Sequence, residues 1–267
     1  MQIDVAGIER ATLAAVSPEA QLEWDGWLMG FDSGSVWRAK SAAPLAHVGL
    51  NALQASHNID AIELQYQHRC QAHADGTTQA AKLGSNAIFR LADMPCFNNL
   101  REQLAQRGYA PVKSTWVQVA PVQAMWQVST GEPADVDIAP DAAWAQLFLG
   151  EGLEAEDGAN RIRNLTRAEA NVYASLRING PSGPQTLAGG AASFSHGWAS
   201  VHGMRTHKQN RGQGLAARVL KALALAAQER RIEQVFLQVE AENWNAQRLY
   251  KKAGFATAWA YRYWCKN

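Results

Sequence analysis

The second half of the chain alternates strand-like and helix-like runs of apolar residues. Two strand-like runs, NVYASLRI and TLAGGAASFS, flank the turn sequence NGPSGP and predict a hairpin. The pattern downstream predicts, in order, a strand at 197–207, a helix at 217–231, a strand at 235–241, a helix at 243–254 and a strand at 255–265. Such alternation is typical of an α/β domain.

The first half shows a similar mixture of elements. Its pattern predicts helices at 3–16, 57–73 and 97–108, strands at 87–93 and 113–120, and a hairpin over 26–41 with its turn at 32–34. After Pro121 we expect a strand at 124–130, a helix at 139–150 and a polar, loop-like stretch with room for a short helix at 152–166.

Two segments share one plan of strand, helix, Gly-aromatic pair and strand. In the first segment, 87–120, the pair is Gly108–Tyr109, and in the second, 235–265, it is Gly254–Phe255. A shared plan at this separation indicates two related units, and two unrelated α/β units with the same pattern are the alternative. We therefore expect two domains, 1–121 and 122–267.

Composition limits the classes of partner. The 267 residues are 47% hydrophobic, enough for a core, and 25 basic against 24 acidic residues give a net charge of +1. This balance predicts neither a nucleic acid nor a membrane surface as the main partner. The start, MQIDVAGIER, lacks a basic and apolar leader, and the three cysteines form no CxxC motif. We expect a cytoplasmic protein without a disulfide framework or metal site, as a monomer or a homodimer.

The sequence RGQGLA, residues 211–216, lies between a predicted strand and a predicted helix. A helix N-terminus has free N–H groups and the positive end of the helix dipole, so it favours an anion. Glycines let a ligand approach the backbone closely. The loop therefore predicts a phosphate or pyrophosphate site, and a tight turn without a ligand is the alternative.

Two motifs in this region resemble those of the GNAT (GCN5-related) N-acetyltransferases. The first is R/Q-x-x-G-x-G/A over 211–216; the register starting at Gln209 also fits, but the Arg211 register places Leu215 and Val219 on the buried helix face. The second is N-x-x-A-x-x-L-Y-x-x-x-G-F, formed by Asn243, Ala246, Leu249, Tyr250, Gly254 and Phe255.

The resemblance implies an α/β (α+β) fold of two GNAT-like domains, each a mixed, mostly antiparallel twisted sheet flanked by helices. Residues 122–267 would be the acetyltransferase domain with the acetyl-CoA site. The first half, 1–121, resembles a degenerate copy of that domain, as in tandem GNAT proteins. It has no counterpart of RGQGLA, and Leu104 stands where the second half has Tyr250.

The resemblance also implies the residues that bind acetyl-CoA. The backbone amides of Arg211, Gly212, Gln213, Gly214, Leu215 and Ala216 would hold the pyrophosphate. Met204, Arg205 and Thr206 would pair through their backbone with the pantetheine arm, because a splayed strand exposes unpaired N–H and C=O groups. Asn243 would face the acetyl-CoA, and it also suits a helix N-cap.

The implied reaction is the direct attack of an amine on a thioester. Tyr250 matches the family's general acid, and a phenol suits protonation of the departing thiolate. The base is open: Gln238 stands where many members carry Glu, while Glu240 lies two residues on and therefore on the same strand face. His202 is the other candidate base, because a histidine ordinarily titrates in a useful range. The third alternative is that no protein base is needed, if water or a low pKa of the acceptor amine suffices.

The expected function is an N-acetyltransferase that acts on a primary amine of a small molecule or peptide. A non-catalytic acyl-CoA-binding or sensing module is the alternative, and Tyr250 argues against it. An unrelated nucleotide-binding protein ranks last, because no Walker lysine follows the glycines. We expect the acceptor in the cleft between the halves, lined by Trp27, Trp37 and Arg38.

Overall fold

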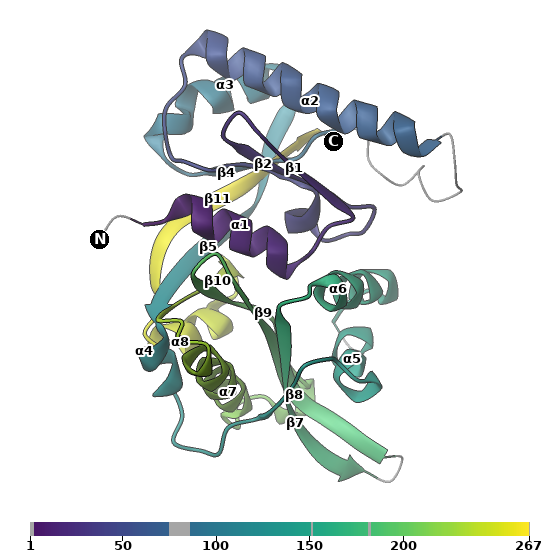
Figure 1. Cartoon of the computed structure of the whole chain (residues 1–267), viewed down its shortest axis with the longest axis vertical. Helices are drawn as coiled ribbons and strands as arrows, with labels where there is room; N and C mark the ends of the chain where they lie inside the picture. The colour runs from purple at the N-terminus through teal and green to yellow at the C-terminus, as the bar shows by residue number, and fades with distance from the viewer. Residues whose placement is uncertain (1–2, 75–85, 151, 181–182, 267) are drawn as a thin grey trace.

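A computed structural model describes residues 3–74, 86–150, 152–180 and 183–266, which build one sheet of eleven strands flanked by helices (Figure 1). The strand order is β1-β2-β3-β4-β11-β5-β10-β9-β8-β7-β6. Neighbouring strands pair antiparallel, except that β3–β4 and β9–β10 pair in parallel. This mixed, mostly antiparallel sheet confirms the predicted fold class.

The elements of the first half are α1 (Val5–Ala15), β1 (Ala20–Trp24), β2 (Trp27–Phe31), the 3₁₀ helix η1 (Trp37–Lys40), β3 (Ala42–Pro44), α2 (Ala52–Ala74), β4 (Phe89–Ala92), η3 (Pro95–Phe97), α3 (Asn98–Gln106) and β5 (Tyr109–Pro121). Those of the second half are α4 (Val122–Trp126), β6 (Asp135–Asp137), α5 (Ala142–Leu149), α6 (Ala155–Arg167), β7 (Asn171–Gly180), β8 (Gly183–Ser195), β9 (Trp198–Thr206), η4 (Lys208–Asn210), α7 (Leu215–Glu229), β10 (Gln234–Glu240), α8 (Trp244–Lys252) and β11 (Ala256–Lys266).

The sheet order is nearly symmetric about the β11–β5 pair. β4, α3 and β5 correspond to β10, α8 and β11, which is the repeat seen in the sequence. β11 lies between β4 and β5, whereas β5 lies between β11 and β10. Each half thus inserts its last strand into the sheet of the other. The division into 1–121 and 122–267 stays a prediction, because one sheet runs through both parts.

The hairpin predicted over 26–41 is wrong in its position. β2 pairs with β1, and the turn is Asp25–Gly26, with φ of +46° and +76°. Asp-Gly is a favoured sequence for a two-residue turn that needs positive φ at both positions. Trp37–Lys40, expected in the second strand, form η1 instead.

Two predictions for the start of the second half also fail. The strand expected at 124–130 is replaced by α4, which follows Pro121 and buries Val122 and Met125, three residues apart on one helix face. The stretch expected as mostly loop contains the full helix α6. Its buried positions include Asn160 and Asn164 beside Leu165, so its inner face has few of the apolar residues on which the prediction depended.

Helices cover both faces of the sheet in the second half (Figure 1). α7 packs on one face through Val219, Leu220 and Leu223, which are fully buried against β7–β10. Helices α1, α5 and α6 lie on the other face, and Trp198 and Phe236 from that face belong to the core of the first half. The two halves therefore share buried apolar contacts. Within the described ranges, no helix is long and apolar enough to cross a membrane.

Candidate active site

The parallel strands β9 and β10 separate partway along their length. They pair only at Ala199–Val235, Ser200–Phe236 and Val201–Leu237, although β9 continues to Thr206 and β10 to Glu240. On its other edge β9 stays paired with β8. The edge of residues 202–206 that faces β10 therefore has backbone N–H and C=O groups without a strand partner, which an amide-bearing ligand can use.

A bulge at Gly203 changes the direction of the side chains that follow it. The β8–β9 register shifts between Gly189–Arg205 and Ala191–His202, which leaves one extra residue in β9. Gly203 has a φ of +61°, a conformation that glycine adopts without strain. As a result Met204 packs in the α7 core, while Arg205 lies over the Phe148 ring of α5 at 5.8 Å.

The loop before α7 presents free amides. Gly212 and Gly214 have φ of +80° and +75°, and a Cβ at either position would meet nothing within 4 Å. Among the described residues, no acceptor is found for the backbone N–H groups of 212–216. These glycines thus combine left-handed backbone with open space at the positive end of a 15-residue helix, which fits a diphosphate.

The side chain of Arg211 bonds to the backbone of β9: its Nε donates a 3.3 Å hydrogen bond to the Thr206 carbonyl oxygen. The bond ties the end of β9 to the loop that precedes α7. Leu215 and Val219 face the core as expected, with Val219 fully buried.

Asn243 is the N-cap of α8. Its Oδ1 accepts a 3.2 Å hydrogen bond from the Ala246 N–H. This capping role, expected as one of two, accounts for the residue within the fold.

Tyr250 lies on α8 with 7% of its surface exposed, against Phe255. Burial raises the pKa of its hydroxyl to about 12, although the positive charge of Arg38 acts in the opposite direction. The phenol therefore stays protonated at neutral pH. Among the described residues, no hydrogen-bond partner is found for this hydroxyl.

The two candidate bases lie in different surroundings. His202 is 5% exposed, and neither ring nitrogen has a hydrogen-bond partner in the part of the chain that is described. Burial, and less strongly the charge of Arg38, lower its pKa to about 3. It is therefore neutral but weakly basic at pH 7. Glu240 is exposed at the last position of β10.

Gln238, two residues before Glu240 on β10, joins several polar side chains through hydrogen bonds. Its Nε2 donates to Oγ1 of Thr12 at 2.8 Å, and its Oε1 accepts from the Tyr261 hydroxyl at 2.8 Å. That hydroxyl lies 3.3 Å from the hydroxyl of Tyr263. Nη1 of Arg38 approaches Oε1 of Gln238 at 3.5 Å. We call Gln238, Thr12, Tyr261, Tyr263 and Arg38 the central polar cluster.

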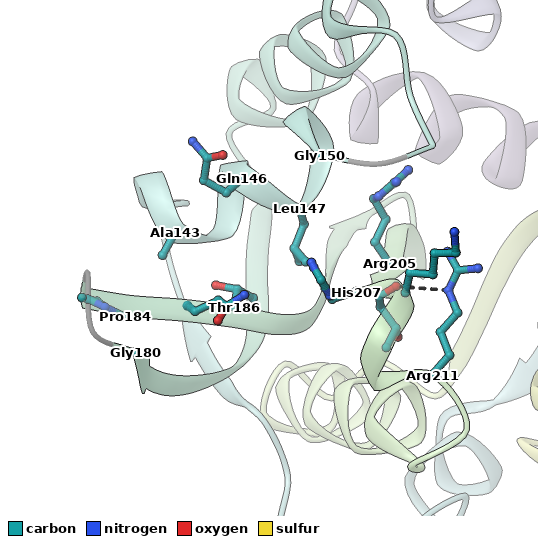
Figure 2. A pocket seen from close by; sticks show the side chains of 14 residues that line it. Ala143, Gln146, Leu147, Gly150, Gly180, Pro184, Thr186, Arg205, His207 and Arg211 are labelled. Carbon is teal, nitrogen blue, oxygen red and sulfur yellow. Dashed lines mark hydrogen bonds between the residues drawn. The ribbon is translucent and has the colours of Figure 1, made fainter.

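A pocket of about 470 Å³ opens beside the end of β9 (Figure 2). Its walls are α5, the β7–β8 hairpin and the segment from Arg205 to Lys208. Arg205 and Arg211 give the pocket a cationic side. Burial, and the nearby charges of Arg161 and Arg211, lower the pKa of Arg205. In the described ranges, no group of three or more His, Cys, Asp or Glu side chains is placed to hold a metal ion.

The structure thus brings Arg205, Thr206 and Arg211 together at the pocket and places Tyr250 and His202 within the field of Arg38. Sequence reasoning missed Thr186 and His207 in the pocket wall and the bulge at Gly203. A glycine inside a strand-like run is a bulge signal that could have predicted the last of these. Trp27, expected in the cleft, is instead buried in the core of the first half.

The class of fold is established by comparison with solved structures. A GCN5-related N-acetyltransferase from Kribbella flavida matches with a TM-score of 0.66 and 16% identity, over 98% of this chain and 95% of that one. A tandem GNAT protein from the clavulanic acid biosynthesis pathway matches with a TM-score of 0.58 and 12% identity, over 97% and 86%. A conserved protein of unknown function from Staphylococcus epidermidis matches with a TM-score of 0.64 and 10% identity, over 97% and 98%.

The chain therefore has the fold of the GCN5-related N-acetyltransferases over nearly its whole length. Residues 184–265, which include both motifs, match the family described as FR47-like protein. These findings confirm the resemblance inferred from the sequence. A search of curated protein sequences finds no relative.

Proposed function

We propose that this protein transfers the acetyl group of acetyl-CoA directly to the primary amine of a small molecule or peptide. The observation that supports the proposal is that two segments of a chain with the GNAT fold have unpaired backbone groups. They are the amides of 212–216 and the edge of β9 at 202–206. The first suits a diphosphate and the second suits a chain of amides. Acetyl-CoA contains both and supplies its acetyl group as an activated thioester.

In this proposal the protein backbone binds the acetyl donor, acetyl-CoA. The free amides of 212–216 bind the pyrophosphate, whereas the Arg211 N–H, expected to take part, already donates to the Lys208 carbonyl oxygen at 3.4 Å. The backbone of Met204, Arg205 and Thr206 pairs with the pantetheine arm. Asn243, at the start of α8, faces the same ligand. A backbone N–H near Met204–Thr206 stabilises the negative charge that develops on the thioester oxygen.

Tyr250 acts as the general acid. The amine nitrogen bonds to the acetyl carbon, the carbon–sulfur bond breaks, and the Tyr250 hydroxyl gives its proton to the departing sulfur. The high pKa of that hydroxyl keeps the proton available at neutral pH. The amine must lose a proton, and His202 and Glu240 stay the candidate bases. The low pKa of His202 makes it a weak base at neutral pH.

Replacing Tyr250 tests this assignment. Tyr250→Phe should slow acetylation, followed as thiol release with a panel of primary amines, by about 100-fold, the usual scale for a general acid. Its affinity for acetyl-CoA, measured by calorimetry, should not change. Tyr173→Phe is the matched control, because Tyr173 is also buried but donates its hydroxyl to the Leu165 carbonyl on α6.

Unchanged turnover in Tyr250→Phe would contradict the acid role. A wild-type protein that binds acetyl-CoA but acetylates no amine would instead indicate the alternative, a non-catalytic acyl-CoA-binding module.

A further inference from the structure

The loop between β2 and η1 fastens the first half of the chain onto α6. Asp32, 3% exposed, accepts hydrogen bonds from Nδ2 of Asn164 at 2.9 Å and from Nη1 of Arg167 at 3.0 Å. The hydroxyl of Ser35 donates to the carboxylate of Asp157. All three partners lie on α6, which belongs to the second half. These hydrogen bonds therefore attach the loop of the first half to the second half.

This attachment fixes η1 and its residue Arg38 beside the candidate active site. Nη1 of Arg38 lies 3.5 Å from Oε1 of Gln238, on the strand face of β10 just beyond the point where β9 and β10 stop pairing. Burial has the largest effect on both groups: it raises the pKa of Tyr250 and lowers the pKa of His202. The positive charge of Arg38 has a smaller, lowering effect on the pKa of each. The guanidinium therefore lies close enough to act on the residues of the transfer step.

No carboxylate in the described part of the chain pairs with Arg38. Its one hydrogen bond there is the long contact with the neutral Gln238 oxygen, and that oxygen already accepts the shorter bond from Tyr261. Arg167 and Arg177, by contrast, both have carboxylate partners. Arg38 is half-buried, and a partly desolvated cation without a counterion is costly unless a ligand supplies the anion.

Neighbouring groups add to the positive field. Lys113, at a bulge in β5 with a φ of +52°, places Nζ 3.9 Å from the ring centre of Trp37, the residue before Arg38. Lys40 follows on η1; its pKa is lowered by burial and by Lys113, and raised by Asp32. Two carboxylates act on these lysines, and both have other partners. Asp32 is bonded to Arg167 and Asn164. Asp157 is bonded to Ser35 and Arg161.

We propose that Arg38 binds a carboxylate of the acceptor, so that the acceptor is an amino acid or a similar amine that carries a carboxylate beside its amine. The planar guanidinium matches a carboxylate through two parallel hydrogen bonds. This inference rests on the proposed function and deepens it.

The test uses pairs of amines that differ only in the carboxylate: tryptophan and tryptamine, tyrosine and tyramine, histidine and histamine, arginine and agmatine. For at least one pair the wild-type chain should acetylate the carboxylated amine with a kcat/KM about 100-fold higher than its partner. Arg38→Ala should remove this preference, mainly by raising KM for the carboxylated amine. Arg38→Lys should restore part of it, because the charge returns without the planar fork.

Controls separate this inference from the proposed function. Acetyl-CoA affinity should be the same in all variants, and Arg10→Ala, which removes an exposed arginine paired with Glu23, should behave as wild type. Wild-type protein that prefers the amines without carboxylate, or prefers phosphoethanolamine to both, would overturn the inference and leave the acetyltransferase proposal intact. An equal loss of kcat/KM for both amines of a pair in Arg38→Ala would also overturn the inference. If Arg38→Ala does not fold, Arg38→Gln replaces it, and wild-type activity of Arg38→Gln toward the carboxylated amine would overturn the inference. Failure of the wild type to bind acetyl-CoA would refute the proposed function itself.

Discussion

The hydroxyl of Tyr261 on β11 donates a 2.8 Å hydrogen bond to Oε1 of Gln238 on β10, although β5 lies between these two strands. The other end of the same amide donates to Thr12 on α1. One side chain therefore links a helix of the first half with two strands of the second half, at the place where the halves exchange strands. The resemblance to the GNAT acetyltransferases led us to expect a glutamate at the position of Gln238, and here the Gln238 amide has a structural task.

Replacing Gln238 should weaken the fold. Gln238→Leu removes the acceptor of the Tyr261 hydroxyl and the donor to Thr12, and should lower the free energy of unfolding by about 1–3 kcal/mol. Urea denaturation measures this. Gln21→Leu, at an exposed position of β1, is the control and should have little effect. Equal stability of the two variants would mean that the central polar cluster does not hold the halves together.

His202 should make stability depend on acidity. Its pKa is about 3 in the folded chain, whereas the ordinary value is 6.5, so below pH 6.5 the unfolded chain binds a proton that the folded chain does not. The free energy of unfolding should therefore fall as pH falls from 6.5 towards 3, by up to about 1.4 kcal/mol per pH unit from this group.

Denaturation at pH 7 and pH 5 tests this dependence. His202→Phe removes the titrating group and keeps a ring against Phe236, so the variant should lose less stability at pH 5 than the wild type. His68→Phe, at an exposed position of α2, should keep the wild-type dependence. A histidine that titrates near pH 6.5 in NMR spectra of the wild type and is absent in His202→Phe would show that His202 is not neutral as described.

The second half should not fold alone. A fragment of residues 122–267 lacks β5, and with it the strand between β10 and β11. It would also expose Tyr261 and Trp259, which are buried in the core of the first half. We expect no cooperative thermal transition by circular dichroism, and recovery of one when the fragment is produced together with residues 1–121. A cooperative transition in the isolated fragment would contradict the strand exchange.

Local signals in the sequence predicted most of the elements. The repeat of strand, helix, Gly-aromatic pair and strand gave the correct equivalence of β4, α3 and β5 with β10, α8 and β11. The Asp25–Gly26 dipeptide is itself a favoured turn sequence, but the glycines at positions 30 and 34 give a competing turn signal. α6 was not predicted because it contains few apolar residues. Asn160 and Asn164 occupy buried positions on it, and Asn164 bonds to Asp32 of the first half.

The candidate site was predictable where it depends on local backbone and not where it depends on distant contacts. Positive φ at Gly212 and Gly214 follows from the residue type and the strand-to-helix turn. The contact between Arg38 and Gln238 joins residues 200 positions apart and requires the order of strands and the attachment of the loop at Asp32. No spacing in the sequence encodes that arrangement.

The central claim, that the amides before α7 hold the pyrophosphate of acetyl-CoA, is tested most directly by calorimetric titration of acetyl-CoA into three proteins: wild type, Gly214→Trp and Gly197→Trp. Gly197, in the β8–β9 turn, is the matched control, since its φ is +77° and a Cβ there also meets nothing within 4 Å. Both substitutions carry the same backbone strain, but only the one at Gly214 fills the space in front of the free amides. We predict binding by wild type and Gly197→Trp and its loss in folded Gly214→Trp; equal binding by all three proteins would contradict the account.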